Sequence, residues 1–123
     1  MILLAQRIMN EFHISLEDRP GALAECCEAI GAAGINIVSG AAMGDSSSAL
    51  GVLVTAEADE TAAALDSVGA SYTMHSLHSA VLVDAPGSLG KFTRELANDG
   101  VNLRSIHIMK TDSSGVHIGY STE

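Results

Sequence analysis

The chain has 123 residues, of which 47% are hydrophobic and only 3% aromatic, and its formal net charge is −9. This length allows one ordinary domain or two very small ones, with a core built from aliphatic side chains. Six Lys and Arg residues stand against 15 Asp and Glu residues, which argues against direct binding of nucleic acid or anionic membranes, because both are bound through basic side chains.

The N-terminal residues and the cysteines indicate the compartment. The apolar run in MILLAQRIMN is too short for a signal-peptide core or a membrane span. Cys26 and Cys27 are adjacent, which suits neither a structural disulfide nor the spacing of zinc ligands. We therefore expect a cytoplasmic protein with reduced thiols, in which this pair has a buried structural role.

The first predicted elements are a strand and a helix. In EFHISLED, apolar residues alternate with polar ones, as in a half-buried strand. Pro20 suits the first position of the helix that follows, and Gly34 is placed to end this helix in a left-handed conformation. The helix has one apolar stripe, made of Leu23, Cys26, Cys27 and Ile30.

Two strands, a second helix and a fourth strand are predicted next. The strands are INIVSGAAM and ALGVLVTA, separated by a polar turn at Gly44–Ser48. DETAAALDSVG has an acidic first turn and a glycine stop at Gly69, which predicts a helix. SYTMHSLH predicts the last strand, so the order is β-α-β-β-α-β, the split βαβ arrangement.

The first part of this pattern is repeated at an offset of 66 residues, where Pro20-Gly21 falls on Pro86-Gly87. The other matched residues are Asp18 and Asp84, Leu23 and Leu89, Ile30 and Leu96, Gly34 and Gly100, and Ile35-Asn36-Ile37 and Val101-Asn102-Leu103. One gap later, Asp45-Ser46-Ser47 matches Asp112-Ser113-Ser114. So many matches in one register indicate an internal structural repeat.

The second copy predicts a strand at Ala80–Asp84, a helix at Gly87–Asp99, and strands at Val101–Lys110 and Gly115–Ser121. We therefore expect an α+β fold of two ferredoxin-like βαββαβ units with antiparallel sheets, at residues 9–78 and 79–123. The second unit is expected to lack its last helix and strand.

The open edge of the second unit must be covered, because exposed edge strands pair with other chains. This predicts a homodimer or higher homo-oligomer, or a strand supplied by a neighbour or by the N-terminal MILLAQRIM.

Two motifs, each present twice, carry a resemblance to a known family. They are D-x-P-G-x-L at the first strand-to-helix turn and G-[IV]-N at the next helix-to-strand turn. Over about residues 9–123, the chain resembles the ACT domain family and looks like the stand-alone tandem ACT proteins. The resemblance implies an allosteric regulatory module without a cofactor. It also implies binding of an amino acid at the interface between two domains whose sheets pair side by side.

Independently of the resemblance, the chemistry of the repeated loops supports ligand binding. Gly21 and Gly87 lack a Cβ, so a ligand can approach the backbone closely. The amides and the dipole at a helix start favour an anion, such as the carboxylate of an amino acid. Asp18 and Asp84 are acceptors that suit the ammonium group of the same ligand.

Asn36 and Asn102 each offer a donor and an acceptor, whereas Arg19 has Ala85 as its counterpart, so the two loops are not equivalent. The candidate ligand-binding residues are Asp18, Arg19, Pro20, Gly21, Ala22, Leu23, Asn36, Asp84, Ala85, Pro86, Gly87, Ser88, Leu89 and Asn102.

These residues also have plain structural interpretations. Asp18 and Asp84 could simply cap the helices, and the glycines and asparagines could serve only the turns.

His107 and His117 lie on neighbouring predicted strands, but two histidines without a nearby carboxylate or thiolate make a poor metal site. No catalytic motif stands out, so we expect neither enzymatic activity nor a metal. The alternative function is a regulatory subunit that acts on a separate metabolic enzyme by protein–protein interaction.

Overall fold

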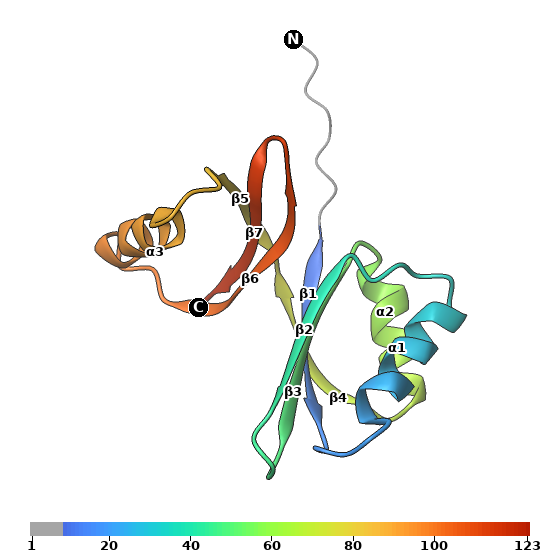
Figure 1. Ribbon diagram of the computed structural model, residues 1–123. Helices are drawn as coiled ribbons and strands as arrows, with labels where there is room; N and C mark the ends of the chain where they lie inside the picture. The colour runs from blue at the N-terminus through green and yellow to red at the C-terminus, as the bar shows by residue number, and fades with distance from the viewer. Residues whose placement is uncertain (1–8) are drawn as a thin grey trace. The chain divides into compact units, whose positions relative to one another are not determined.

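The computed structural model describes residues 9–123, and the chain divides into two compact units, of which the first ends at Ser76 and the second begins at Leu77 (Figure 1). Most of the MILLAQRIM segment lies outside the described residues, so the strand predicted for it stays a prediction. No helix among residues 9–123 is long and apolar enough to cross a membrane.

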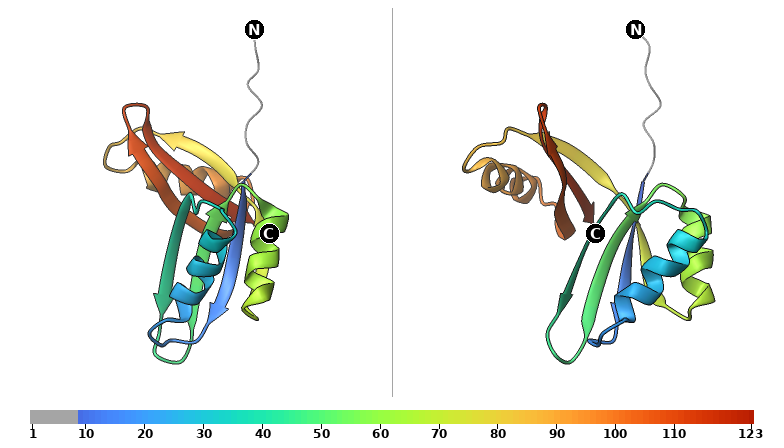
Figure 2. Two further views of the ribbon diagram at one scale, coloured as in Figure 1. Left: turned by 90° about the vertical axis from the view of Figure 1, so that its right-hand side faces the viewer. Right: turned by 45° about the vertical axis from the view of Figure 1, so that its right-hand side comes forward.

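The first unit has the predicted β-α-β-β-α-β order. Its elements are β1 (Asn10–Leu16), α1 (Ala22–Ala32), β2 (Ser39–Gly44), β3 (Ala49–Thr55), α2 (Ala58–Ser67) and β4 (Ser71–Ser76). The strands form one antiparallel sheet in the order β2-β3-β1-β4, and both helices cover the same face of it (Figure 2).

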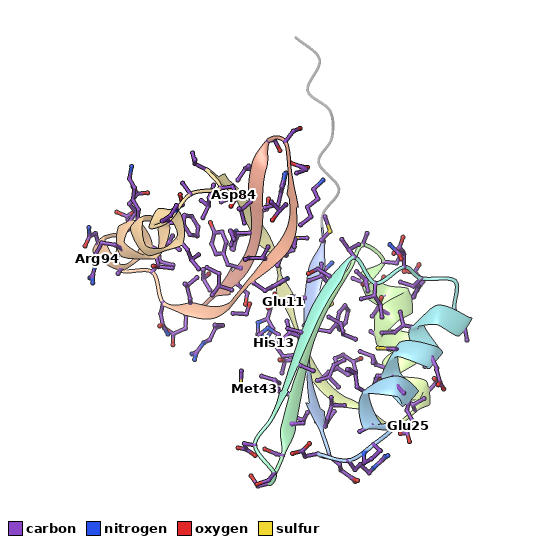
Figure 3. The ribbon with its side chains drawn as sticks, viewed as in Figure 1. Glu11, His13, Glu25, Met43, Asp84 and Arg94 are labelled. Atoms are coloured by element: carbon purple, nitrogen blue, oxygen red, sulfur yellow. The ribbon has the colours of Figure 1, made fainter. Side chains whose placement is uncertain are left out.

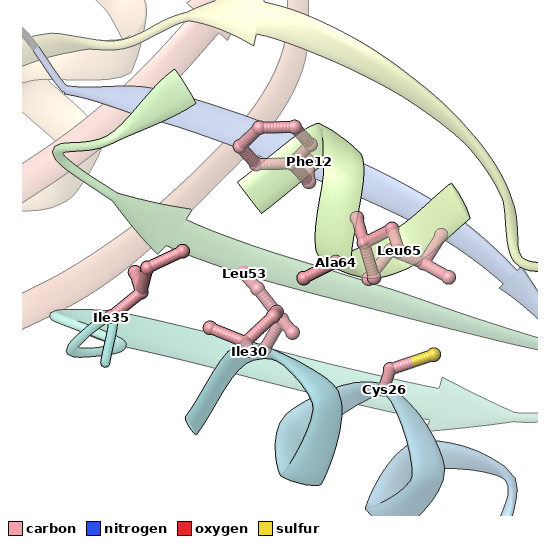
Figure 4. Packing of buried hydrophobic residues seen from close by; sticks show 8 residues of the cluster. Phe12, Cys26, Ile30, Ile35, Leu53, Ala64 and Leu65 are labelled. Atoms are coloured by element: carbon pink, nitrogen blue, oxygen red, sulfur yellow. The ribbon is translucent and has the colours of Figure 1, made fainter. Parts of the chain in front are cut away.

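The core of the first unit lies between the sheet and its two helices (Figure 4). Phe12 and Ile14 on β1 are fully buried, because side chains at a spacing of two share one face of a strand. The predicted apolar stripe of α1 is confirmed. The other members of the buried cluster are Cys26, Ile30, Ile35, Leu53, Ala64 and Leu65.

The ends of α1 test two predictions. Gly34 does end the helix with a left-handed φ of +77°, and the amide of Ile35 donates to the carbonyl of Ile30 at 3.2 Å. The prediction that Pro20 is the first helical residue is wrong. The helix begins at Ala22, because Gly21 before it has a φ of +89° and interrupts any earlier helical turn.

The second unit consists of β5 (His78–Leu82), α3 (Ser88–Asn98), β6 (Leu103–Asp112) and β7 (Gly115–Thr122). Its antiparallel sheet has the order β5-β7-β6, so the α+β class with two antiparallel sheets is confirmed. The first strand comes two residues earlier than the predicted Ala80–Asp84, because only Leu77 separates β4 from β5. The assignment of residues 9–78 and 79–123 to two ACT domains stays a prediction.

The two units bury their equivalent helices to different extents. Ile30 on α1 is 0% exposed, whereas its counterpart Leu96 on α3 is only half-buried, and α3 has no fully buried residue. In the first unit α2 packs against α1, but the described residues of the second unit contain no counterpart of α2. The second unit therefore has the smaller core.

Truncation of these two matched residues should have different consequences. We expect Ile30→Ala to lower the free energy of unfolding of the first unit by about 2–5 kcal/mol, the cost of a cavity in a packed core. Leu96→Ala should cost about 1 kcal/mol, as is usual at partly exposed positions. Hydrogen exchange followed by mass spectrometry reads the two units separately. Equal losses in both units would contradict the difference in burial.

Candidate functional site

The first loop (Asp18–Leu23) and the second loop (Asp84–Leu89) have the same backbone conformation. Gly21 has a φ of +89° and Gly87 a φ of +88°, a left-handed conformation that residues with a Cβ disfavour. The Glu25 amide donates to the Gly21 carbonyl at 2.9 Å, and the Lys91 amide donates to the Gly87 carbonyl at 3.0 Å. The repeat in the sequence is therefore a repeat in structure.

Both helix starts lack a side-chain cap. No side chain accepts a hydrogen bond at the start of α1 or α3, and the first amides of a helix have no acceptor within the helix itself. The interpretation of Asp18 and Asp84 as helix caps is therefore wrong. The amides remain available to an anion from solution.

Asp18 has a different role, since it joins the first loop to the turn between β2 and β3. Its Oδ2 accepts a hydrogen bond from the Ser46 amide at 2.8 Å. A Cβ on Gly44 would lie 2.7 Å from Oδ1 of Asp18, so a larger residue there would require the Asp18 carboxylate to shift. The counterpart Asp84 is exposed and accepts no hydrogen bond from the described residues.

Arg19 closes over the first loop. Its Nε donates to Glu17 at 2.8 Å, its terminal nitrogens donate to Glu25 at 3.3 Å, and the two carboxylates together raise the pKa of the guanidinium, Glu25 more than Glu17. A Cβ on Gly21 would lie 3.7 Å from Nη1 of Arg19, whereas a Cβ on Gly87 would meet nothing within 4 Å. The second loop is the more open of the two.

The other candidate residues are not all at the loops. Pro20, Ala85 and Pro86 are exposed, Leu23 and Ser88 are half-buried, Leu89 is 45% exposed and Ala22 only 7%. Asn36 and Asn102 are exposed but follow the far ends of α1 and α3. Each helix has 11 residues, so at the usual rise per residue each Asn lies about 16 Å from the loop of its own unit. One amino acid therefore cannot contact both within one unit.

A polar cluster on β1 and β4 was missed by the sequence analysis. Glu11 is fully buried and hydrogen-bonds to Nε2 of His13, and Figure 3 labels these two residues. The rings of His13 and His75 have centroids 4.2 Å apart, and Oγ1 of Thr73 lies 2.9 Å from Nε2 of His75. The cluster shares a sheet face because β1 pairs Glu11 with His75 and His13 with Thr73.

This β1–β4 cluster lies on the face opposite Phe12 and Ile14, since its residues alternate with them along β1. The alternation in EFHISLED already places Glu11 and His13 together, but only the register with β4 adds His75. Among the described residues, no group of three or more His, Cys, Asp or Glu side chains has the geometry to hold a metal ion.

The histidines of the second unit do not form the pair that the sequence suggested. His117 lies opposite Lys110, and His107 lies opposite Gly119. Nε2 of His117 lies 3.0 Å from Asp112 and 2.9 Å from Oγ of Ser114. Because both neighbours contact the same ring nitrogen, this is not a catalytic triad, in which the acid and the nucleophile bind opposite nitrogens.

The turn that contains Asp112 is instead part of the repeat. Hydrogen bonds to the Asp112 carboxyl hold its pKa well below its usual range, and the bond with Ser114 has a larger effect than the one with His117. In the turn between β2 and β3, a hydrogen bond from the Ser48 amide lowers the pKa of the Asp45 carboxyl in the same way. In both turns the aspartate accepts a hydrogen bond from the amide two residues later, an ordinary turn-forming arrangement.

The thiols are unsuited to nucleophilic chemistry. Cys26 is buried, Cys27 is half-buried and both are free. Burial raises the pKa of both thiols, and the reactive form of a cysteine is the thiolate. Their role in packing, expected from the helical pattern, is confirmed for Cys26, which belongs to the buried cluster.

Comparison with known proteins gives matches in structure only. No family model and no curated protein matches the sequence. Protein BT0572 from Bacteroides thetaiotaomicron matches with a TM-score of 0.79 and 16% identity, covering 95% of this chain and 81% of its own. The ligand-free regulatory subunit of aspartate kinase from Thermus thermophilus matches with a TM-score of 0.71 and 21% identity, covering 95% and 83%.

The regulatory subunit of aspartate kinase from Thermus flavus gives similar values, a TM-score of 0.72 and 20% identity over 95% of this chain and 84% of its own. At these identities the shared feature is the fold. The chain shares this fold over 95% of its length, in agreement with the resemblance of its repeated motifs to ACT domains.

Proposed function

We propose that this chain is a non-catalytic regulatory protein that binds a small ligand, an α-amino acid, at its strand–helix loops. The observation that carries the proposal is the pair of uncapped helix starts, each preceded by a left-handed glycine. The fold shared with regulatory subunits of aspartate kinase supports a regulatory role.

The second loop has the chemistry that a zwitterion needs. The carboxylate of the ligand would accept hydrogen bonds from the first amides of α3, where the helix dipole favours negative charge. Gly87 leaves open space for this approach. The exposed carboxylate of Asp84 would take the ammonium group (Figure 3), and the first turn of α3 contains no acidic residue to repel the anion.

The first loop is less favourable for the same ligand. Arg19 lies beside Gly21, and its charge is already balanced by Glu17 and Glu25. Glu25 also stands in the first turn of α1, where its negative charge opposes the carboxylate of a ligand. Asp18 is held by the Ser46 amide. We therefore place the main site at the second loop.

Asn36 and Asn102 enter this proposal only through association. Each lies at the far end of a helix from the loop of its own unit, so a ligand at a loop does not reach the asparagine of the same unit. A site shared with another copy of the chain, as the resemblance to ACT domains implies, would bring a loop and an asparagine together.

The alternative is a subunit that regulates a separate metabolic enzyme by contact alone. The exposed apolar side chains of the second unit favour it, since exposed apolar surface marks interaction sites. These residues include Val81, Val83, Leu89 and Ile108. Purification of an enzyme with the chain, together with no response to any amino acid, would favour this alternative.

A thermal-shift screen of the twenty amino acids should find at least one ligand. At 100 times its Kd, a ligand that binds only the folded state stabilises it by about 2.7 kcal/mol, an easily measured rise in Tm. Gly87→Ala should weaken binding at least tenfold, because the new methyl group occupies the approach to the backbone.

Gly100→Ala is the matched control for this change. Gly100 also has a positive φ and open space around it, but it lies at the other end of α3. Both changes should cost similar stability, and only Gly87→Ala should affect the ligand. Equal loss of binding in the two variants, or no response to any amino acid at millimolar concentration, would contradict the proposed site.

Opening the first loop should change the number of ligands bound. We expect isothermal titration calorimetry to find one ligand per chain in the native protein, and a second in the double variant Arg19→Ala and Glu25→Gln, which removes both the covering side chain and the opposing charge. Glu28→Gln, which neutralises an exposed carboxylate farther along α1, should leave one. Two equal sites in the native protein would refute the assigned preference.

A further inference from the structure

The two matched helices carry opposite charges at equivalent positions. At the offset of 66 residues, Glu25 and Glu28 on α1 correspond to Lys91 and Arg94 on α3. All four side chains are exposed, so burial does not account for the difference. The surface of α3 is therefore basic at the positions where the surface of α1 is acidic.

Neither Lys91 nor Arg94 pairs with a carboxylate among residues 9–123, and Figure 3 shows Arg94 on the outer side of α3. Glu95 follows Lys91 by four residues, but this order of charges is the less favourable one for an ion pair along a helix. The other Lys and Arg residues of this range each form an ion pair, and they are Arg19, Arg104 and Lys110. Both cations on α3 thus remain available to a carboxylate from outside the chain.

The two cations lie on a face of α3 whose other side chains are short. The opposite face packs on the sheet, where the ring of Phe92 lies 5.4 Å from that of Tyr120. The α3 outer face consists of exposed residues at helical spacings of three, four and seven, namely Gly90, Lys91, Arg94, Ala97 and Asn98. A Cβ on Gly90 would meet nothing within 4 Å. Short side chains let another helix approach closely, to about 8 Å between axes.

The distribution of charge favours an acidic partner at the second unit. Between Glu11 and Asp66 lie ten acidic residues and one basic one, a net charge of 1 − 10 = −9. Between Leu77 and Glu123 lie five acidic and four basic residues, a net charge of 4 − 5 = −1. An acidic protein is therefore repelled by the first unit and can approach the second at little electrostatic cost.

The spacing of the cations indicates the form of this partner. Side chains three residues apart on a helix have Cβ atoms about 5–6 Å apart, and carboxylates three or four apart on a second helix match this spacing. Two cations are too few for nucleic acid, which is bound through many phosphate contacts. A second copy of α1 fits poorly, because Arg19 already pairs with its Glu25.

We propose that the α3 outer face is a docking surface for an acidic helix of a separate protein. Carboxylates of that helix pair with Lys91 and Arg94, and its backbone passes over Gly90 and Ala97. Exposed ion pairs are weak and are screened by salt, so the contact is reversible, as a regulator requires. The contact needs no ligand at the second loop and is independent of the proposed amino-acid site.

Fluorescence anisotropy tests the surface on the full chain. The probe is a short fluorescein-labelled helical peptide with glutamates three and four residues apart, and its glutamine analogue should not bind. The double variant Lys91→Glu and Arg94→Glu should raise the Kd of the peptide at least tenfold. The matched control is Arg104→Glu with Lys110→Glu, which makes the same change of charge at two exposed cations of the same unit that already have partners. This control should change the Kd less than threefold.

Equal weakening in the two double variants, or no binding of the peptide by the native protein at millimolar concentration, would overturn the proposal. A single-stranded DNA oligomer that binds more tightly than the peptide would overturn the assignment to an acidic protein. A native dimer that dissociates only in the Lys91→Glu and Arg94→Glu variant would assign the surface to a second copy instead.

Nuclear magnetic resonance locates the contact without any substitution. In the ¹⁵N-labelled full chain, the peptide should shift the amide resonances of Gly90–Asn98, and raising the salt from about 0.05 to 0.3 M should reduce these shifts. The matched residues Ala24–Ala32 of α1 should not respond. Shifts that are as large on α1 as on α3 would overturn the proposal.

Discussion

A left-handed glycine between strand and helix is the constraint on which each half of this molecule depends. β1 must leave its sheet and return as α1 over the same sheet within five residues, and Gly21 makes this possible with a φ of +89°. A residue with a Cβ would cost roughly 1–2 kcal/mol there. The same conformation leaves the helix start uncapped, so one backbone requirement produces both the packing of the helix and the candidate site.

Much of the architecture could be predicted because it depends on local periodicity. Phe12 and Ile14 lie two residues apart and both enter the core, and Gly34 ends α1 as its position indicates. The repeat extended these inferences to the second unit, where Gly87 adopts the conformation of Gly21. The start of α1 was misplaced because proline has the same φ in a turn as in the first turn of a helix, so the sequence alone cannot separate the two.

The candidate site was less predictable because its decisive contacts join distant residues or depend on side-chain rotamers. Asp18 looked like a helix cap, but its partner is the Ser46 amide, 28 residues later. The contacts of Arg19 with Glu17 and Glu25 depend on its rotamer, and its role as a ligand contact stays a prediction. The contact between His13 and His75 follows from the register of β1 with β4, and no local pattern in the sequence encodes that register.

The repeat also shows how two copies of one motif can diverge. The first copy has a complete core, and its loop is occupied by its own charged side chains. The second has an open loop and almost no net charge. Burial that stabilises the first copy is thus missing at the matched positions of the second, as Ile30 and Leu96 illustrate. If the second copy gains that burial from a second chain, then its folding and its association are one equilibrium, and a ligand at its loop would act on both.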